Sequence, residues 1–152
     1  MKPAHLLAAV ILSFGTASSA MAECAEGVAP DLNTLGPGVN WKFCVLSPGT
    51  NLSGQVMTSM ILNNTILEDV KFIRTDLRGA KLRHARLRWS DMTDADLNQA
   101  NLTKANLTGA TLIRANLWKA ILVGTIFDGA DLSGATWVDG RECATPSIGQ
   151  CN

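Results

Sequence analysis

Four cysteines are the residues of this 152-residue chain whose type and spacing most directly suggest chemistry: Cys24, Cys44, Cys143 and Cys151. Cysteines can form disulfides in an exported chain or bind zinc. No CxxC spacing is present, and the only histidine after residue 22 is His84, so a zinc site is disfavoured. An even count favours disulfides, and four cysteines allow three pairings.

Carboxylates are the other side chains that could do acid–base chemistry, in pairs such as Asp76 and Asp96. No nucleophile stands with a base in the sequence, and there is no Gly-rich phosphate loop. His84 alone lacks the companions that a metal site or a general base needs. The Asp and Asn residues recur where a repeat places them, which is the simpler explanation. We therefore predict no enzymatic activity, no catalytic residue, no metal ligand and no cofactor.

A five-residue repeat runs without insertion from Thr50 to Asp139, which gives 18 blocks over 90 residues. The third residue of each block is large and apolar, and we call it the centre. The centres are Leu52, Met57, Leu62, Leu67, Phe72, Leu77, Leu82, Leu87, Met92, Leu97, Leu102, Leu107, Leu112, Leu117, Leu122, Phe127, Leu132 and Trp137. Two residues before the centre stands a residue that is usually small, ten times alanine. One spatial environment must therefore recur every five residues.

Period five fits neither a helix, with period 3.6, nor a flat strand, with period 2. It suits a chain that turns a corner after every block, so that each block is a short extended rung and a turn. None of the 36 residues at the centre and small positions is charged, Gln55 is their only amide, and all 19 charged residues of the repeat stand elsewhere. This segregation predicts an all-β solenoid with a narrow apolar interior.

The stacking of charges predicts the number of sides, because residues one coil apart lie about 4.8 Å from each other. A four-sided coil, with four blocks to each turn, stacks five oppositely charged pairs and one like pair, Asp76–Asp96. A three-sided coil, with three blocks to each turn, stacks two opposite pairs and three like pairs. Four sides are favoured, and 18 blocks then make about 4.5 coils. The opposite pairs are Glu68–Arg88, Lys71–Asp91, Arg74–Asp94, Asp94–Arg114 and Lys119–Asp139.

The ends of the chain differ in composition from the repeat. Residues 1–22 are typical of a signal peptide, with an apolar run too short to span a bilayer and a cleavage site after Ala22. We expect a periplasmic or secreted protein without a transmembrane segment after cleavage. Residues 23–49 and 140–152 are interpreted as caps on the ends of the rod, where backbone groups would otherwise stay unpaired. Trp41 and Leu46 lie five residues apart in another register, which suggests a first irregular coil there.

The rod also separates the cysteines. Two stand before the repeat and two after it, and a disulfide needs Cα atoms within about 7 Å. Pairing within each cap, Cys24–Cys44 and Cys143–Cys151, is therefore favoured.

Several blocks resemble the A-(D/N)-L-x-x signature of the pentapeptide-repeat family, such as Ala-Asp-Leu-Asn-Gln at 95–99 and Ala-Asn-Leu-Thr-Lys at 100–104. The resemblance covers residues 50–139. It implies a right-handed, four-sided (quadrilateral) parallel β-helix and no catalytic activity. The tail from Trp137 to Cys151 is similar to the end of secreted bacterial members with terminal cysteine pairs.

Two surfaces are candidate binding sites. The second coil is basic and suits an anionic partner such as a cell-wall polymer, lipopolysaccharide or nucleic acid, although its charges spread around the rod and partly face acids on neighbouring coils. Its basic residues are Lys71, Arg74, Arg78, Lys81, Arg83, Arg86 and Arg88. Trp89 and Trp118 occupy outward positions, where a partner, or the tail in the case of Trp118, could cover them.

Charge and export limit the function classes. The whole chain has 13 Lys and Arg against 13 Asp and Glu, and loss of Lys2 with the signal leaves a net charge of −1. This balance argues against nucleic acid as a partner. We predict an exported non-enzymatic scaffold or binding module, for an anionic envelope polymer or a protein. A topoisomerase-binding DNA mimic, a role known in the family, and a polysaccharide-acting β-helix enzyme remain the alternatives.

Overall fold

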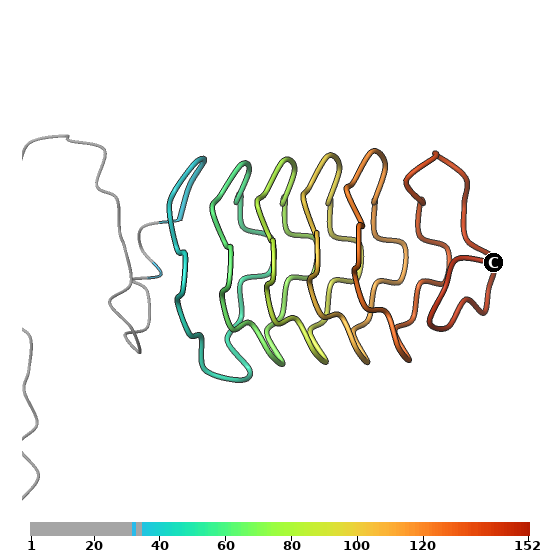
Figure 1. Cartoon of the computed structure of the whole chain (residues 1–152), viewed down its shortest axis with the longest axis horizontal. Helices are drawn as coiled ribbons and strands as arrows, with labels where there is room; N and C mark the ends of the chain where they lie inside the picture. The colour runs from blue at the N-terminus through green and yellow to red at the C-terminus, as the bar shows by residue number, and fades with distance from the viewer. Residues whose placement is uncertain (1–31, 33–34) are drawn as a thin grey trace, which may run out of the picture.

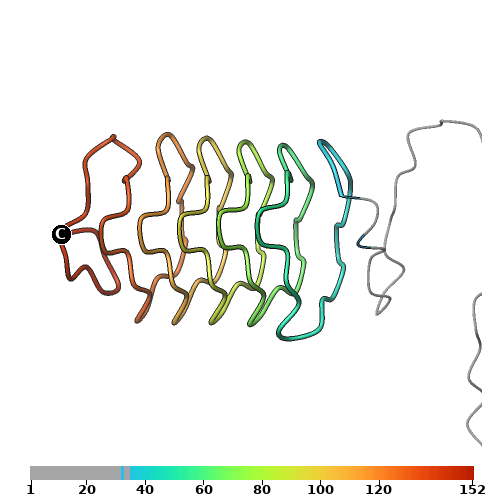
Figure 2. The same ribbon diagram turned by 180° about the vertical axis from the view of Figure 1, so that it is seen from behind.

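The structure is a computed structural model, and it describes Leu32 and residues 35–152. Over these residues the backbone winds into a rod of stacked coils, with the C-terminus at one end (Figure 1). The view from behind shows the same stacking (Figure 2). Within the described residues the backbone contains neither an α-helix nor a strand longer than one bridge residue. In that part of the chain, no helix has the length and apolar character to cross a membrane.

Parallel bridges join each coil to the next. From Asn51↔Lys71 to Asn116↔Thr136, every bridge joins positions that are four blocks of five apart. The four-sided solenoid predicted from charge stacking is therefore confirmed. The handedness and the number of coils stay predictions.

We number the four faces of the rod by their centres. Face 1 carries Leu52, Phe72, Met92, Leu112 and Leu132, and face 2 carries Met57, Leu77, Leu97, Leu117 and Trp137. Face 3 carries Leu62, Leu82, Leu102 and Leu122, and face 4 carries Leu67, Leu87, Leu107 and Phe127.

Each block folds in the same way, as the block around Leu77 shows. Asp76 forms the bridges to the neighbouring coils, and the Leu77 side chain is fully buried on the axis. Arg78 and Gly79 make the turn, which the Ala80 N–H closes by donating to the Leu77 carbonyl at 3.0 Å. Each block thus consists of one bridge residue, one inward centre, two turn residues and one small inward residue.

The Asp or Asn before the centre stabilises this turn. The Oδ1 atom of Asp96 accepts the Asn98 N–H at 3.0 Å, that of Asn106 accepts the Thr108 N–H at 2.9 Å, and Asp131 accepts the Ser133 N–H at 3.0 Å. Only a short side chain with an oxygen at this position reaches the N–H two residues on. The recurring Asp and Asn residues therefore have a structural role.

The small inward residues also contribute hydrogen bonds where they are hydroxylic. Thr75 is buried, and its Oγ1 donates to the Leu52 carbonyl on the coil before at 2.9 Å. The prediction that Gln55 points inward is wrong, because its side chain is exposed. Met60, which is about as long, is fully buried at the same position of the next block, so the cost of burying a polar amide explains the difference.

The N-terminal end has one extra residue. The bridges Asn40↔Ile61 and Val45↔Ile66 join positions one residue further apart than those of the regular ladder, and Trp41 and Leu46 are buried beneath the regular coils. The predicted irregular first coil is confirmed. Cys44 is disulfide-bonded, whereas its predicted partner Cys24 and the signal peptide lie outside the described residues.

The C-terminal tail folds back over the last coil. It forms the antiparallel bridges Asp131↔Ile148 and Thr136↔Glu142, and the Cys143–Cys151 disulfide closes it, which confirms that pairing. These bridges lie on faces 1 and 2 only. On faces 3 and 4 the last coil ends at residues 121–129, where the centres Leu122 and Phe127 are only partly buried.

Candidate binding surface

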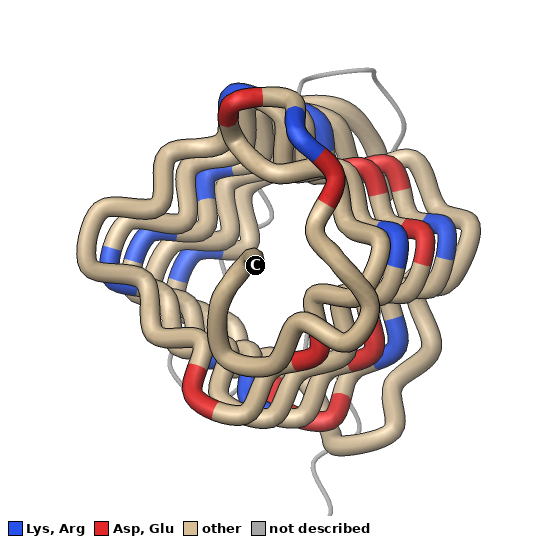
Figure 3. The backbone as a smooth tube through the Cα atoms, turned by 90° about the vertical axis from the view of Figure 1, so that its right-hand side faces the viewer, with Lys and Arg blue, Asp and Glu red and all other residues tan. Residues whose placement is uncertain are grey.

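The predicted basic coil is spread over all four faces of the rod. Seen down the axis, Lys and Arg occupy every side of the tube (Figure 3). Lys71 and Arg74 lie on face 1, Arg78 on face 2, Lys81 and Arg83 on face 3, and Arg86 and Arg88 on face 4. These residues therefore do not form one patch, and their individual contacts decide which of them can meet a partner.

Arg78 is held by carboxylates on two coils. Its Nε and Nη2 donate to the two oxygens of Asp76 at 2.8 and 2.6 Å, and its Nε lies 3.8 Å from Asp96 Oδ2. The hydrogen bond from Arg78 lowers the pKa of Asp76, and the same bond raises the pKa of Arg78. Arg78 thus offsets the repulsion between the stacked carboxylates of Asp76 and Asp96.

Two other members of the basic coil also have acidic partners. Arg74 Nε lies 4.0 Å from Asp94, which also accepts two hydrogen bonds from Arg114 at 2.7 and 2.9 Å. The hydrogen bond from Arg114 lowers the pKa of Asp94. Arg86 pairs with Glu68 at 2.8 Å. Glu68 and Arg88 do stand one coil apart as predicted, but the Glu68 carboxylate forms its ion pair with Arg86.

The remaining cations lack such partners. Lys71, Lys81 and Arg83 make no ion pair with any residue that the structure describes. Arg88 stacks on its neighbour Trp89, with Cζ 4.2 Å from the ring centroid. Lys81 and Arg83 are exposed and lie on the same face, so they are the members most available to an anion.

Trp89 and Trp118 are both exposed, at 55% and 43%. Trp89 lies over Gly109, where an added Cβ would stand 2.6 Å from Trp89 Cδ1. Trp118 carries the Lys119 ammonium 4.0 Å above its ring and has Gly140 of the tail beside its indole edge. The tail therefore flanks Trp118 without covering it.

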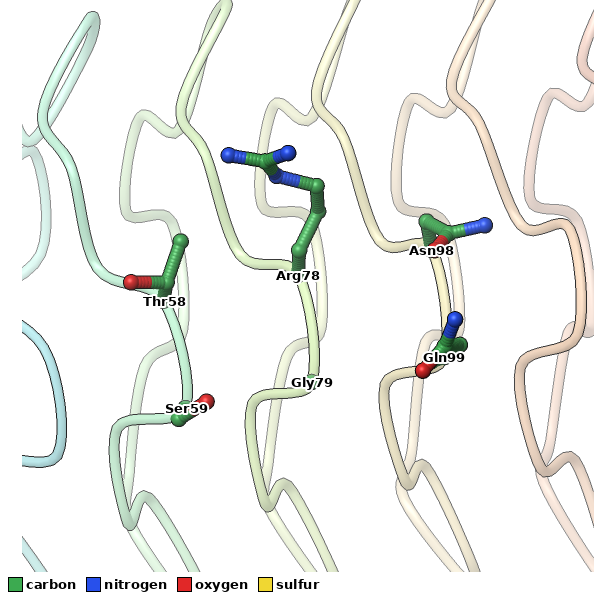
Figure 4. A pocket seen from close by; sticks show the side chains of 6 residues that line it. All are labelled: Thr58, Ser59, Arg78, Gly79, Asn98 and Gln99. Carbon is green, nitrogen blue, oxygen red and sulfur yellow. The ribbon is translucent and has the colours of Figure 1, made fainter.

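A shallow hollow crosses three coils on face 2 (Figure 4). It is lined by Thr58, Ser59, Arg78, Gly79, Asn98 and Gln99. Gly79 stands between Ser59 and Gln99 in one column, so the hollow is the space that a side chain at Gly79 would occupy. Its walls are hydroxyls, amides and the Arg78 guanidinium, which can bind a polar group but do not pair a nucleophile with a base.

Face 3 has a property that we did not predict. It carries Lys81, Arg83, His84 and Lys104, and no Asp or Glu from Ile61 to Gly124. One flank of the tube in Figure 3, at the left, accordingly shows blue segments without red. The signal was present in the sequence, because sorting charges by a period of four blocks places all nine acids of the repeat on the other three faces. Within the described residues, no group of three or more metal-ligating side chains gathers on any face.

Comparison with known proteins supports the repeat. The family model for pentapeptide repeats matches residues 71–109 and 100–136, in eight copies. No curated protein sequence matches the chain.

Three solved structures are similar to parts of it. The pentapeptide repeat protein Rfr23 from the cyanobacterium Cyanothece 51142 is 35% identical over 59% of this chain and 56% of its own, with a TM-score of 0.49. A thylakoid-lumen pentapeptide repeat protein of Arabidopsis thaliana is 26% identical over 68% of this chain and 83% of its own, with a TM-score of 0.39. HetL from Nostoc sp. PCC 7120, involved in regulating heterocyst differentiation, is 26% identical over 70% of this chain and 60% of its own, with a TM-score of 0.34. The chain thus spans little more than half of Rfr23.

Proposed function

The chain is a pentapeptide-repeat protein over residues 71–136, and from that premise we propose that it acts as an exported, non-enzymatic binding scaffold. The proposed partner is an anionic envelope polymer or a protein. Export follows from the signal peptide predicted at residues 1–22.

One observation carries the proposal: the carboxylates and amides that recur along the rod are used by the fold itself. Asp96 and Asp131 each use Oδ1 to accept a turn N–H two residues on, so these carboxylates stabilise their own block. The centres fill the axis. What the repeat leaves outside is a regular set of turn side chains, which suits recognition of a partner better than turnover of a substrate.

A polysaccharide-acting enzyme is the first alternative, with Asp76 and Asp96 as its pair of acid–base carboxylates. Asp76 is held by Arg78, which lowers its pKa, so this carboxyl is a poor proton donor near neutral pH. Asp96 accepts from both the Asn98 N–H and the Asn116 amide. We expect no hydrolysis of envelope glycans, and turnover that Asp76→Ala or Asp96→Ala abolished would replace the scaffold with an enzyme.

A topoisomerase-binding DNA mimic is the second alternative. Such a mimic needs a strongly acidic surface, whereas the repeat carries 10 Lys and Arg against 9 Asp and Glu, and face 3 holds no acid. We expect no inhibition of gyrase supercoiling by the purified protein, and strong inhibition would favour the mimic.

The test of the scaffold begins with export. The full chain is produced with residues 1–22 in a Gram-negative host, and the mass of the periplasmic product is measured. We expect a product that begins at Glu23. Retention of the uncleaved chain in the cytosol would overturn the exported role.

The second step is capture. The exported protein serves as bait in envelope extract, and the same protein with reduced and alkylated cysteines serves as the control. Retained glycan and protein are measured separately. A component held by the folded bait and not by the control supports binding, and its absence in repeated captures overturns the proposal.

A further inference from the structure

The four faces of the repeat have unequal charge. Face 1 has three basic residues (Lys or Arg) and three acidic residues (Asp or Glu). Faces 2 and 4 each have two basic and three acidic residues. Face 3 has three basic residues and no acid, hence a charge of +3 before His84 is counted. Lys42 of the irregular first coil extends the same face toward the N-terminus, because its neighbour Phe43 donates its N–H to the Asn63 carbonyl. The rod therefore carries one continuous acid-free strip.

One pair of basic side chains on this strip, His84 and Lys104, stands in register along the axis. Lys81 bridges Ile61 and Asn101, which fixes its position between two coils. His84 and Lys104 are one coil apart, at the same turn position of consecutive coils. Side chains at equivalent positions of adjacent coils lie about 4.8 Å apart. The strip thus presents Lys81, Arg83 and His84 on one coil and Lys104 on the next.

The surroundings of these cations are amides rather than carboxylates. Asn63 lies one coil before Arg83, and its Oδ1 accepts the Arg83 N–H at 3.0 Å. Asn101 lies one coil after Lys81. From Ile61 to Lys104 this face carries no Phe, Tyr or Trp side chain. Cations flanked by amides can bind acidic groups and hydroxyls together, whereas single-stranded nucleic acid is held largely by aromatic stacking.

We propose that face 3 is the docking strip for a linear anionic polysaccharide, held by Lys81, Arg83, His84 and Lys104. This inference rests on the proposed binding role and names its site and its partner. A polymer with repeated carboxylate or phosphate groups matches a group of exposed cations that the solenoid holds on two consecutive coils of one face. An exposed strip without a deep pocket suits an extended chain better than a compact ligand.

The turn conformation of His84 and Lys104 is the one that the repeat uses on all four faces. His84 and Lys104 occupy the left-handed region, with φ of 57° and 56°, where glycine is the favoured residue. Gly79, Gly109 and Gly124 take glycine at the same turn position. Ser59, Asp69 and Arg74 take the same conformation on the other three faces, so it belongs to the repeat, and glycine can replace Lys104 without straining the turn.

A pair of matched variants tests the site. Lys81→Gln with Arg83→Gln removes two charges from face 3, and Arg74→Gln with Arg114→Gln removes two from face 1, so both proteins have the same net charge. Binding of polygalacturonate is measured at low ionic strength, with uncharged dextran as the control polymer. We expect the face 3 variant to bind at least about tenfold more weakly and the face 1 variant to bind like the parent protein. Equal losses in both variants would show that bulk charge, and not face 3, holds the polymer.

Lys104→Gly provides an independent check on folding. Because glycine suits φ of 56°, this variant should melt no lower than the parent and still bind the polymer more weakly. Unchanged binding by Lys104→Gly together with Lys81→Gln and Arg83→Gln would overturn the site.

The same assays separate this inference from the scaffold on which it rests. If the parent protein binds neither polygalacturonate nor a phosphate-bearing polysaccharide while the bait still captures a protein, the binding scaffold is supported and the polysaccharide site on face 3 is wrong. If duplex DNA binds more tightly than either polysaccharide at the same salt concentration, the partner is a nucleic acid and the inference also fails.

Discussion

The Asp94 carboxylate accepts both of its strong hydrogen bonds from Arg114, one coil further along face 1, at 2.7 and 2.9 Å. These two residues stand four blocks apart in the sequence, so their contact exists only because the coil has four sides. An exposed pair of this kind contributes little to the free energy of unfolding, and its measurable effect lies in the pH dependence.

Acid should weaken the fold through Asp94 and Asp76. The hydrogen bonds from Arg114 and Arg78 lower the pKa of these carboxyls in the folded chain, below the ordinary value of about 4. Their stabilisation is therefore complete above that value and is lost as the pH falls through the lowered pKa. We expect Asp76→Asn with Asp94→Asn to flatten the decline of urea stability between about pH 4 and pH 2. Asp128→Asn is the control, and an equal flattening there would contradict the assignment.

Loss of a centre should cost more in the middle of the axis than at its open end. Leu97 is fully buried between Leu77 and Leu117, so Leu97→Ala should reduce the free energy of unfolding by about 2–5 kcal/mol. Leu122→Ala makes the same change where the last coil is only partly covered, and should cost clearly less. Urea titration of both variants gives the comparison. A similar cost for the two would mean that the open end is covered in solution.

The contact of Trp89 with Gly109 should appear in a pair of glycine substitutions. Gly109 and Gly129 occupy the same column of face 4 with φ of 68° and 66°, so alanine is strained at both. At Gly109 alone the new Cβ would meet Trp89, 2.6 Å away, and at Gly129 it would meet nothing within 4 Å. Gly109→Ala should therefore destabilise by about 1 kcal/mol more than Gly129→Ala. Trp89→Ala in the Gly109→Ala background should remove that difference, and tryptophan fluorescence reports the movement of the ring.

The tail should depend on its disulfide. Cys143 and Cys151 close a short loop over faces 1 and 2, and replacing both with serine should cost about 2–3 kcal/mol. The tail should also become the first site of limited proteolysis, while the repeat stays protected. Unchanged tail protection in the double variant would show that the antiparallel bridges alone hold the tail.

The sequence was sufficient for the coil and insufficient for the contacts on its surface. Stacked charges predicted four sides, and Arg74 and Arg114 do pair with Asp94 as expected. Glu68 instead takes Arg86, because side chains at corners can reach sideways as well as along the axis. A long flexible side chain can reach several charged groups, and its position in the repeat does not determine with which of them it forms an ion pair.

The candidate site was predicted only in part for the same reason. Lys81 and Arg83 look like Arg78 and Arg86 in the sequence, and only the three-dimensional contacts show that the second pair is already bound to carboxylates. Lys104 was not predicted as part of the site because it lies one coil beyond the basic second coil of residues 71–88. Gln55 occupies an inward position of the repeat in the sequence, but its side chain is exposed, because burying its amide without a hydrogen-bond partner is unfavourable.

Because four blocks complete one coil, the number of blocks in the chain determines the direction, about the rod axis, in which each later block faces. Removing or adding one block would turn everything beyond it by one face, and four blocks would restore the original orientation. The tail would then cover a different pair of faces, while the strip at Lys81 and Arg83 stayed where it was. The number of blocks, as much as the residues within them, therefore sets the direction in which the closed end of the rod faces relative to its basic side.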